Sequence, residues 1–378
     1  MEFLKNPFLV RPFIILGIVL GLDKLLLLQA VREYTTSYMH IEDHFYDTRE
    51  DLLNHLKEHY TARKAAGEKL GLIFGTSRSG EFDSAEISKI APKTYTYNFS
   101  APQAGHSYHA YWLQRILEQN IRPDFVLLES DPITLSPNAN RFPIKHSLDI
   151  SFLLKHIDFD SDASPWRNGG GFSTEHFERF LLSRMFAAYR FPVDLRAAAR
   201  NRESHIMPVG PGIQMVTGLE IRRAMLAQMK EASIRNLGGI PNPHALELPE
   251  NLMNRDAETM ASLHLPRPYH TGRAQTRLFR EMLEGLARES IPTVVFWPPV
   301  VSRFREIMRE TGAQDMARSG TTEIIERLGK DYPKAKLRFV EADSKGMQCR
   351  IFFDSIHIAG KCYPELTKLL LKEIQSDL

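Results

Sequence analysis

Five short apolar runs that alternate with helical patterns constrain the fold of this 378-residue chain more than any other feature. The runs span residues 71–74, 94–99, 124–128, 293–297 and 337–340. Apolar residues recur at helical spacing in segments 106–119, 302–311, 322–328 and 363–374. Strands that are apolar throughout are typical of a parallel sheet, since helices then cover both of its faces. With right-handed crossovers, the pattern predicts a three-layer α/β/α domain that is doubly wound and flavodoxin-like.

A long connection between the third and fourth runs predicts an inserted segment. It spans roughly 150 residues, from 138 to 288, which is far too long for a bare loop. Apolar stripes within it predict helices, and they consist of Phe177, Phe180, Leu181, Met185 and Tyr189, and then of Leu219, Met225 and Met229. Such helices either pack on the sheet domain or form a lid or substrate platform. We therefore expect a helical linker at 32–70, a sheet domain in two parts at 71–137 and 291–378, and a helical insertion at 138–290.

The N-terminus carries the longest hydrophobic run of the chain. Residues 8–31 read FLVRPFIILGIVLGLDKLLLLQAV. About 20 apolar residues cross a bilayer as a helix, and this run meets that length if Asp23 and Lys24 are tolerated within it. Charged residues at a membrane end can reach the interface with their side chains. The run therefore predicts a single membrane-spanning helix.

The residues around this run predict its orientation. Lys5 and Arg11 lie near its start, which favours an N-terminus inside the cell and export of the remainder. A small-x-small cleavage site does not follow the run. We expect residues 1–31 to be an uncleaved signal anchor, with a cleaved signal or a buried core helix as alternatives. The predicted location is the inner membrane, with the globular part facing the periplasm or the exterior.

Charge and cysteine content exclude several classes of protein. The formal net charge is +2, from 48 basic and 46 acidic residues. This balance offers no electrostatic signature of nucleic-acid binding, which needs a clustered basic face. The two cysteines, Cys349 and Cys362, are too few for a disulfide-dense scaffold or a four-cysteine zinc site. They either pair with each other or remain separate thiols.

Polar residues that follow the predicted strands are candidates for chemistry, because functional groups gather beyond the carboxyl ends of parallel strands. After the first run, Gly75 permits a tight turn and Ser77 stands at the start of the next segment. Near the C-terminus, Asp354 lies three residues before His357, which can place both side chains on one face of a turn. The carboxylate would then orient the imidazole, and the imidazole would take a proton from a serine.

This combination resembles the SGNH (GDSL-like) superfamily of hydrolases and acyltransferases. In that superfamily a serine follows the first strand and an Asp-x-x-His block closes the domain. The resemblance covers residues 71–137 and 291–376, and it implies Ser77 as nucleophile, His357 as general base and Asp354 as the acid that orients it. An anchor ahead of such a domain is similar to the membrane-tethered acyl-transfer branch that includes the alanylation protein DltD and the alginate acetylation proteins.

The chain departs from the superfamily pattern where the oxyanion donors are expected. The block-two glycine has no clean counterpart, since Gly105 lies about two residues late, and Ser100 is another candidate. The block-three Gly-x-Asn-Asp is replaced by Glu-Ser-Asp-Pro at 129–132, where Ser130 or a backbone amide could substitute. Loss of one oxyanion donor costs roughly 3–4 kcal/mol of transition-state stabilisation.

Other polar and aromatic residues predict no cofactor. His106 and His109 begin a helix without acidic neighbours, so no metal site is expected there. The glycines at 169–171 lack the lysine and hydroxyl of a phosphate loop. Trp297, followed by two prolines, either forms a rigid wall of a substrate cleft or simply ends its strand.

The resemblance implies a membrane-tethered serine esterase or O-acyltransferase that acts on an acyl ester of a cell-envelope glycan or lipid. Its partners would be an acyl donor, a glycan or lipid acceptor and the membrane, with room for a membrane protein that takes part in acyl transfer. An alternative is a catalytically degenerate domain of the same type that binds envelope polymer or acts as a scaffold. A nucleotide-binding domain is disfavoured, because no Gly-x-Gly-x-x-Gly follows a strand.

Overall fold

The computed structural model describes residues 7–35, 42–158, 170–209, 212–241 and 248–377. The chain divides into two compact units, and each is described by itself. One unit comprises Met1–His44 and Glu175–Gln228, and the other comprises Phe45–Thr174 and Met229–Leu378. We refer to them as the small unit and the sheet unit.

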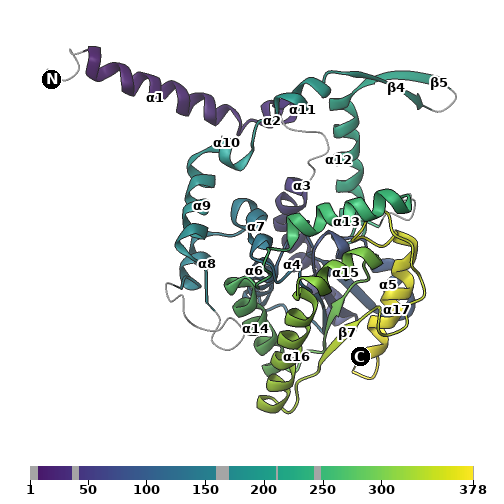
Figure 1. Ribbon diagram of the computed structural model, residues 1–378. Helices are drawn as coiled ribbons and strands as arrows, with labels where there is room; N and C mark the ends of the chain where they lie inside the picture. The colour runs from purple at the N-terminus through teal and green to yellow at the C-terminus, as the bar shows by residue number, and fades with distance from the viewer. Residues whose placement is uncertain (1–6, 36–41, 159–169, 210–211, 242–247, 378) are drawn as a thin grey trace. The chain divides into compact units, whose positions relative to one another are not determined.

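A five-stranded parallel sheet forms the centre of the sheet unit (Figure 1). Its strands are β1 (Lys69–Phe74), β2 (Thr94–Asn98), β3 (Phe125–Glu129), β6 (Thr293–Trp297) and β7 (Leu337–Glu341). They are ordered β2-β1-β3-β6-β7, and every neighbouring pair is parallel. The predicted α/β class and the five predicted strands are confirmed. This order reverses direction between β1 and β3, the topological switch point at which doubly wound sheets bind ligands.

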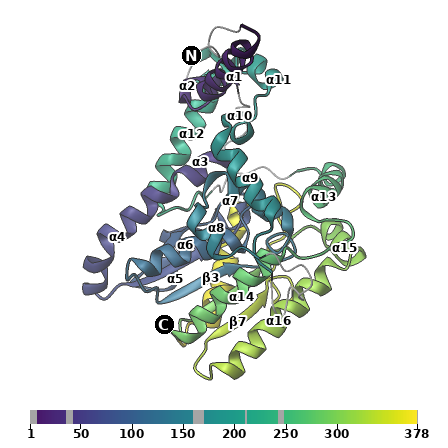
Figure 2. The ribbon, with the colours of Figure 1, turned by 90° about the vertical axis from the view of Figure 1, so that its left-hand side faces the viewer.

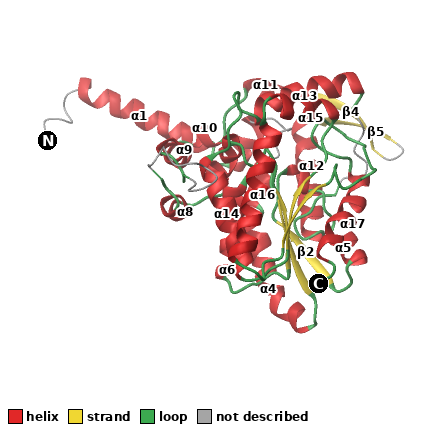
Figure 3. Ribbon diagram, turned by 60° about the horizontal axis from the view of Figure 1, so that its bottom comes forward, coloured by secondary structure: helices red, strands yellow, loops and turns green. Residues whose placement is uncertain are grey.

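Helices cover both faces of this sheet (Figures 2 and 3). On one face lie α5 (Ser84–Ile90) and α17 (Tyr363–Ile374), and on the other lie α6 (His106–Glu118), α14 (Arg273–Arg288) and α16 (Ala313–Asp331). The core between the sheet and α17 contains fully buried strand and helix side chains, namely Ile73, Phe125, Leu127, Val294, Phe296, Leu366, Leu370 and Ile374. Each such side chain contributes roughly 1.5–3 kcal/mol through its burial.

The remaining helices of the sheet unit surround this core. They are α4 (Arg49–Ala65), α7 (Arg141–His146), α8 (Ile150–Lys155), α13 (Glu250–His264) and α15 (Ser302–Glu310). The predicted helices at 106–119, 302–311 and 363–374 are confirmed to within a residue. The prediction at 322–328 covers only the second half of α16. Its first half buries small side chains, among them Ala313 and Ala317, which produce no apolar stripe in the sequence.

The small unit contains helices and one β-hairpin. Its helices include α1 (Pro7–Leu25), α2 (Gln29–Thr35), α10 (Ala187–Arg190) and α11 (Leu195–Arg200), while α3 (Glu42–Asp47), α9 (Thr174–Met185) and α12 (Gly218–Arg235) run across the divisions between the units. The hairpin pairs β4 (Ser204–Val209) with antiparallel β5 (Gly212–Thr217). The sequence patterns do not predict this hairpin, since they indicate only helices in this part of the chain.

Asp23 and Lys24 of the N-terminal run hold α1 to the start of α10. The Asp23 carboxylate accepts hydrogen bonds from the amides of Ala187 and Ala188, each at 2.8 Å. The Lys24 ammonium donates to the carbonyl of Met185. Both charges at the end of the hydrophobic run therefore have partners within the small unit.

The apolar side chains of α1 are not buried by this unit. Phe13, Ile15 and Leu22 are each at least 60% exposed, although they lie on different sides of the helix. Among the described residues, no helix alone is both long enough and apolar enough to cross a bilayer. The segments Arg11–Leu25 and Gln29–Thr35 reach that threshold only as a pair, and they are bent by 86°. The membrane span remains a prediction.

The two cysteines form a disulfide. Cys349 is bonded to Cys362, 13 residues further along the chain, with the Cα atoms 5.4 Å apart. The bond ties the loop after β7 to the start of α17. Of the two alternatives that the sequence leaves open, the structure contains the pair.

We expect reduction of this disulfide to destabilise the protein by about 3 kcal/mol, because the bond restricts a 13-residue loop in the unfolded chain. Urea unfolding of the full-length protein with and without a phosphine reductant measures the change. The double variant Cys349→Ser/Cys362→Ser should unfold at the reduced midpoint and show no response to reductant. An unfolding midpoint that is unaffected by reductant would contradict the prediction.

Candidate active site

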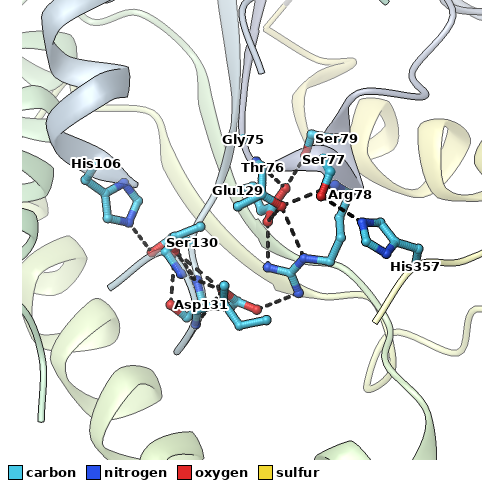
Figure 4. Close-up of polar contacts among 12 residues, drawn as sticks. Gly75, Thr76, Ser77, Arg78, Ser79, His106, Glu129, Ser130, Asp131 and His357 are labelled. Atoms are coloured by element: carbon cyan, nitrogen blue, oxygen red, sulfur yellow. Dashed lines mark hydrogen bonds and ion pairs between the residues drawn. The ribbon is translucent and has the colours of Figure 1, made fainter. Parts of the chain in front are cut away.

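Ser77, His357 and Asp354 lie in contact. The sequence patterns pointed to these three residues because they follow predicted strands. Ser77 Oγ is 2.7 Å from His357 Nε2, and the two side chains point toward one another in Figure 4. His357 Nδ1 is 2.7 Å from Asp354 Oδ2 and 2.9 Å from Oδ1. The serine follows β1, whereas the other two residues lie between β7 and α17. The fold thus joins residues 280 positions apart in the sequence.

The Asp354 carboxylate determines which ring nitrogen of His357 faces the serine. Burial raises the pKa of Asp354, but the hydrogen bond and charge of His357 and the amides of Ile356 and His357 outweigh it, so the pKa is lowered. The ionised carboxylate only accepts hydrogen bonds, and therefore Nδ1 carries the proton. The lone pair of Nε2 then faces Ser77 Oγ, as a general base requires.

The turn that presents Ser77 requires glycine at position 75. A Cβ at Gly75 would lie 2.3 Å from Ser79 Oγ and 2.5 Å from Glu129 Oε2, too close for any side chain. Thr76 then caps a short 3-10 turn (Ser77–Ser79) by accepting a hydrogen bond from the Arg78 amide. The strand therefore ends abruptly, and Ser77 is the first residue of the turn.

Glu129, at the end of β3, holds this turn in place (Figure 4). Its carboxylate is fully buried and accepts from the Thr76 amide at 3.0 Å and the Thr76 hydroxyl at 2.7 Å. It also accepts from Ser79 Oγ at 2.5 Å and from Arg78 Nη2 at 2.6 Å. Four donors of the residues that flank Ser77 thus converge on one carboxylate.

Arg78 joins the ends of β1 and β3 through a buried ion-pair network. Its guanidinium is 1% exposed, and Nη1 lies 2.7 Å from Asp131 Oδ2. Burial lowers the pKa of Arg78, but the charges of Asp131 and Glu129 more than offset this and raise it. The guanidinium therefore stays charged and balances one of the two carboxylates.

The three residues suggested as oxyanion donors lie elsewhere in the site. Ser130 Oγ is 3.1 Å from His106 Nε2, and its amide donates to the Phe296 carbonyl. Ser100 is fully buried, and Gly105 is the N-cap of α6, packed against Gln275. Within the described part of the chain, none of the three forms a hydrogen bond with Ser77 or His357.

His106 and His109 lie behind the serine turn and connect it to β3. His109 Nε2 is 3.2 Å from the Gly75 carbonyl, His109 Nδ1 is 3.4 Å from His106 Nδ1, and His106 in turn contacts Ser130. Burial lowers the pKa of His109 to about 3 and also lowers that of His106. Both rings are therefore neutral at pH 7. In the ranges that the structure describes, no three His, Cys, Asp or Glu side chains are placed to bind a metal.

The family relationship extends well beyond the residues around Ser77. The family model described as "Protein of unknown function (DUF1574)" matches residues 3–374. The chain belongs to this family. The match to DUF1574 includes the hydrophobic N-terminal run, both parts of the sheet unit and the candidate site. No curated protein matches the chain.

His264 is a site residue of this DUF1574 chain that the sequence patterns do not reveal. It ends α13, where the next residue, Leu265, packs with Ile133 and Ile356. Ile356 immediately precedes His357, so His264 lies beside the base loop. The helix is separated from Ser77 and His357 by long stretches of sequence, and therefore no local spacing could have indicated this position.

The electrostatic surroundings of His264 keep its ring neutral. Burial and the electrostatic effect of Arg78 and His357 lower its pKa to about 4, against the opposing effect of Asp131 and Asp354. The ring is half-buried and forms no hydrogen bond with any described residue. A neutral imidazole next to the candidate base can thus donate one hydrogen bond to a bound molecule.

Proposed function

We propose that this DUF1574 protein is a membrane-tethered serine esterase or O-acyltransferase with an SGNH-like three-layer domain. The observation that carries the proposal is the hydrogen-bonded series from Ser77 Oγ through His357 to Asp354. A nucleophile, a base and an orienting acid in this order are the requirements for acyl transfer through a serine. The order of the sheet strands, with Ser77 at the switch point, agrees with this reading.

In the proposed reaction, Ser77 Oγ attacks the carbonyl carbon of an acyl ester while His357 Nε2 takes its proton. The tetrahedral intermediate collapses, the C–O bond to the alcohol breaks, and His357 returns the proton to the leaving alcohol. An acyl-serine remains. Water or a second hydroxyl group then attacks this ester, His357 takes its proton, and the acid or new ester leaves as the proton returns to Ser77. Asp354 stabilises the imidazolium in both halves.

Two groups near the serine are available to stabilise the oxyanion in this proposal. The first group is the Ser77 amide, which makes no hydrogen bond within the described residues. The neighbouring Thr76 amide, in contrast, donates to the Glu129 carboxylate. The neutral His264 ring is a second donor. Preorganised donors of this kind act where negative charge develops in the transition state.

The small unit and the disulfide support a location outside the cytoplasm. The exposed apolar surface of α1 suits a single-pass anchor in the inner membrane. Disulfides form and persist in oxidising compartments such as the bacterial periplasm. We therefore propose that the sheet unit faces the periplasm or the exterior and acts on an acyl ester of an envelope glycan or lipid.

One observation favours a second candidate function. Ser100, Gly105 and Ser130, the positions where SGNH-like proteins are expected to supply oxyanion donors, form no hydrogen bond with Ser77 within the described residues. A domain with a serine and base but a weak oxyanion site could bind envelope polymer or act as a scaffold without turnover.

Labelling with a fluorophosphonate probe distinguishes the two functions. We expect the full-length protein, solubilised in detergent, to form one covalent adduct on the peptide that contains Ser77, detected by mass spectrometry. Inactive protein unfolded in urea serves as the background control. A folded protein that forms no adduct would contradict the enzyme and favour the scaffold.

A further inference from the structure

The base loop, residues 342–359 between β7 and α17, carries both Asp354 and His357. All of its residues are described, and they form no helix or strand, only an isolated bridge of Phe352 with Ile358. No regular hydrogen-bond ladder therefore holds the loop against the sheet. The position of His357 relative to Ser77 depends on individual contacts that the loop makes with neighbouring elements.

Bonds inside the loop hold Asp354 and His357 to each other. Asp354 Oδ1 accepts hydrogen bonds from the amides of Ile356 and His357, at 2.9 and 2.8 Å, while its Oδ2 contacts the imidazole. The Phe353 ring stacks on the imidazole, with the ring centroids 5.0 Å apart. These contacts make the acid and the base one compact unit, but they do not fix that unit relative to Ser77.

Asp256, on α13, holds the base loop from outside. Its Oδ2 accepts hydrogen bonds from Ser355 Oγ at 2.6 Å and from the Ser355 amide at 2.9 Å. Ser355 is fully buried, and its carbonyl accepts from the amide of Val301, just before α15, at 3.1 Å. The residue that follows Asp354 is thus bound through its amide, hydroxyl and carbonyl to elements outside the loop.

The base loop is the one polar contact of the Asp256 side chain. In the part of the chain that the structure describes, its carboxylate has hydrogen bonds only with Ser355 and forms no ion pair. A half-buried carboxylate without a cation loses solvation that only hydrogen bonds offset. By contrast, Glu258 on the same helix is exposed and is paired with Arg303 of α15.

One face of α13 lies along the loop. The less exposed residues of the helix recur at helical spacing, and they are Met253, Asp256, Ala257, Met260, Ala261 and His264. Ala257 and Ala261 belong to one buried cluster with Ile356 of the loop, and α13 packs against α15 (Figures 1 and 2). The same face that brings Asp256 to Ser355 therefore ends in His264, near His357.

We propose that Asp256 is a positioning residue of the reaction at Ser77. Through Ser355 it keeps the base loop where His357 Nε2 faces Ser77 Oγ, at 2.7 Å. The inference rests on the proposed function. Asp256 forms no hydrogen bond with Ser77 or His357 within the described residues, so it acts through the loop and not on the substrate. A misplacement of about 1 Å in a catalytic group costs roughly 100-fold in rate.

Two variants of nearly equal side-chain size test this role. Asp256→Asn keeps an oxygen that accepts both hydrogen bonds of Ser355, so kcat for p-nitrophenyl acetate hydrolysis should stay within about threefold of wild type. Asp256→Leu has no acceptor, and we expect kcat about 100-fold lower with KM unchanged. Steady-state kinetics of the full-length protein in detergent measures both. Equal kcat values for the two variants, or a change confined to KM, would overturn the inference.

Glu258→Leu is the matched control on the same helix. It makes the same kind of change and breaks the ion pair with Arg303 between α13 and α15, but it leaves the contact with Ser355 intact. Its kcat should stay at the wild-type value. A loss as large as that of Asp256→Leu would mean that any damage to α13 lowers the rate, which rules out a specific role for Asp256.

Ser355→Ala tests the same contact from the loop, and it does so even if Asp256→Leu fails to fold. It removes the hydroxyl donor and keeps the amide bond to Asp256, so we expect a smaller loss of kcat, about tenfold. Unchanged kcat in this variant would contradict the inference.

Fluorophosphonate labelling separates failure of this inference from failure of the proposed function. We expect slow labelling of Asp256→Leu beside wild-type rates in Asp256→Asn and Glu258→Leu. Equal labelling rates of wild type and Asp256→Leu overturn the positioning role alone and leave the enzyme standing. A wild-type protein that forms no adduct overturns the proposed function, and the positioning role with it.

Discussion

Ser77→Ala should lower kcat for p-nitrophenyl acetate hydrolysis by about 10⁴-fold or more, because it removes the proposed nucleophile. The substitution deletes one hydroxyl whose hydrogen-bond partner is His357 Nε2, at 2.7 Å. It leaves the turn and the Glu129 network intact, so the fold should not change. Steady-state kinetics of the full-length protein in detergent, with circular dichroism as a check of folding, measures the effect.

The control for this variant is another serine of the sheet unit. Ser88 lies exposed on α5 and donates only to the carbonyl of Ala85. Ser88→Ala should retain wild-type kcat. Hydrolysis that persists in Ser77→Ala would show that another residue, or a contaminant, carries the activity.

Asp354→Asn gives an independent measure of the same site. An amide at this position can hydrogen-bond the other ring tautomer, which would turn an N–H of His357 toward Ser77. We expect a loss of kcat on the order of 10⁴-fold with little change in folding. Equal activity of Asp354→Asn and wild type would argue against His357 as the base.

Glu129→Ala should have the largest effect on stability, a loss of about 3–5 kcal/mol, because it breaks one of the two buried ion pairs of Arg78 and leaves four buried donors without their acceptor. Arg78 is 1% exposed and would keep only Asp131 as a counter-charge. The Thr76 and Ser79 hydroxyls would also lose their acceptor. Urea unfolding of the full-length protein, followed by circular dichroism, measures the change.

Glu129→Gln separates the two roles of this carboxylate. It keeps the size of the side chain but loses the charge, so we expect a smaller loss of stability with a clear fall in the fluorophosphonate labelling rate. Glu323, exposed on α16, is the matched control, and Glu323→Gln should change stability by no more than about 0.5 kcal/mol. Unchanged stability in Glu129→Ala would show that the network does not hold the turn.

Much of the sheet unit follows from local sequence patterns. The strands β3 and β6 were predictable because a strand buried on both faces is apolar along most of its length, as FVLL in β3 and VVFW in β6 are. The helix α17 was predictable to the residue from its apolar spacing. Where burial involves small side chains, as in the first half of α16, the pattern is absent from the sequence.

The parts of the candidate site that are local in sequence were likewise accessible. Asp354 and His357 are three residues apart, so one turn suffices to bring the carboxylate to the ring. Gly75 and Ser77 could be read as a strand end followed by an exposed hydroxyl. The DUF1574 family model matches residues 3–374, almost the whole chain, but its description assigns no activity to the family.

The sequence by itself determined the α/β class, the strands and the short segments that carry Ser77, Asp354 and His357. Only the tertiary structure decided which of these segments meet, because a contact between residues 280 positions apart depends on strand order and not on local spacing. The same reason applies to the Glu129 network, to His264 and to the Cys349–Cys362 bond. Each joins elements whose proximity is set by how the sheet and its helices pack.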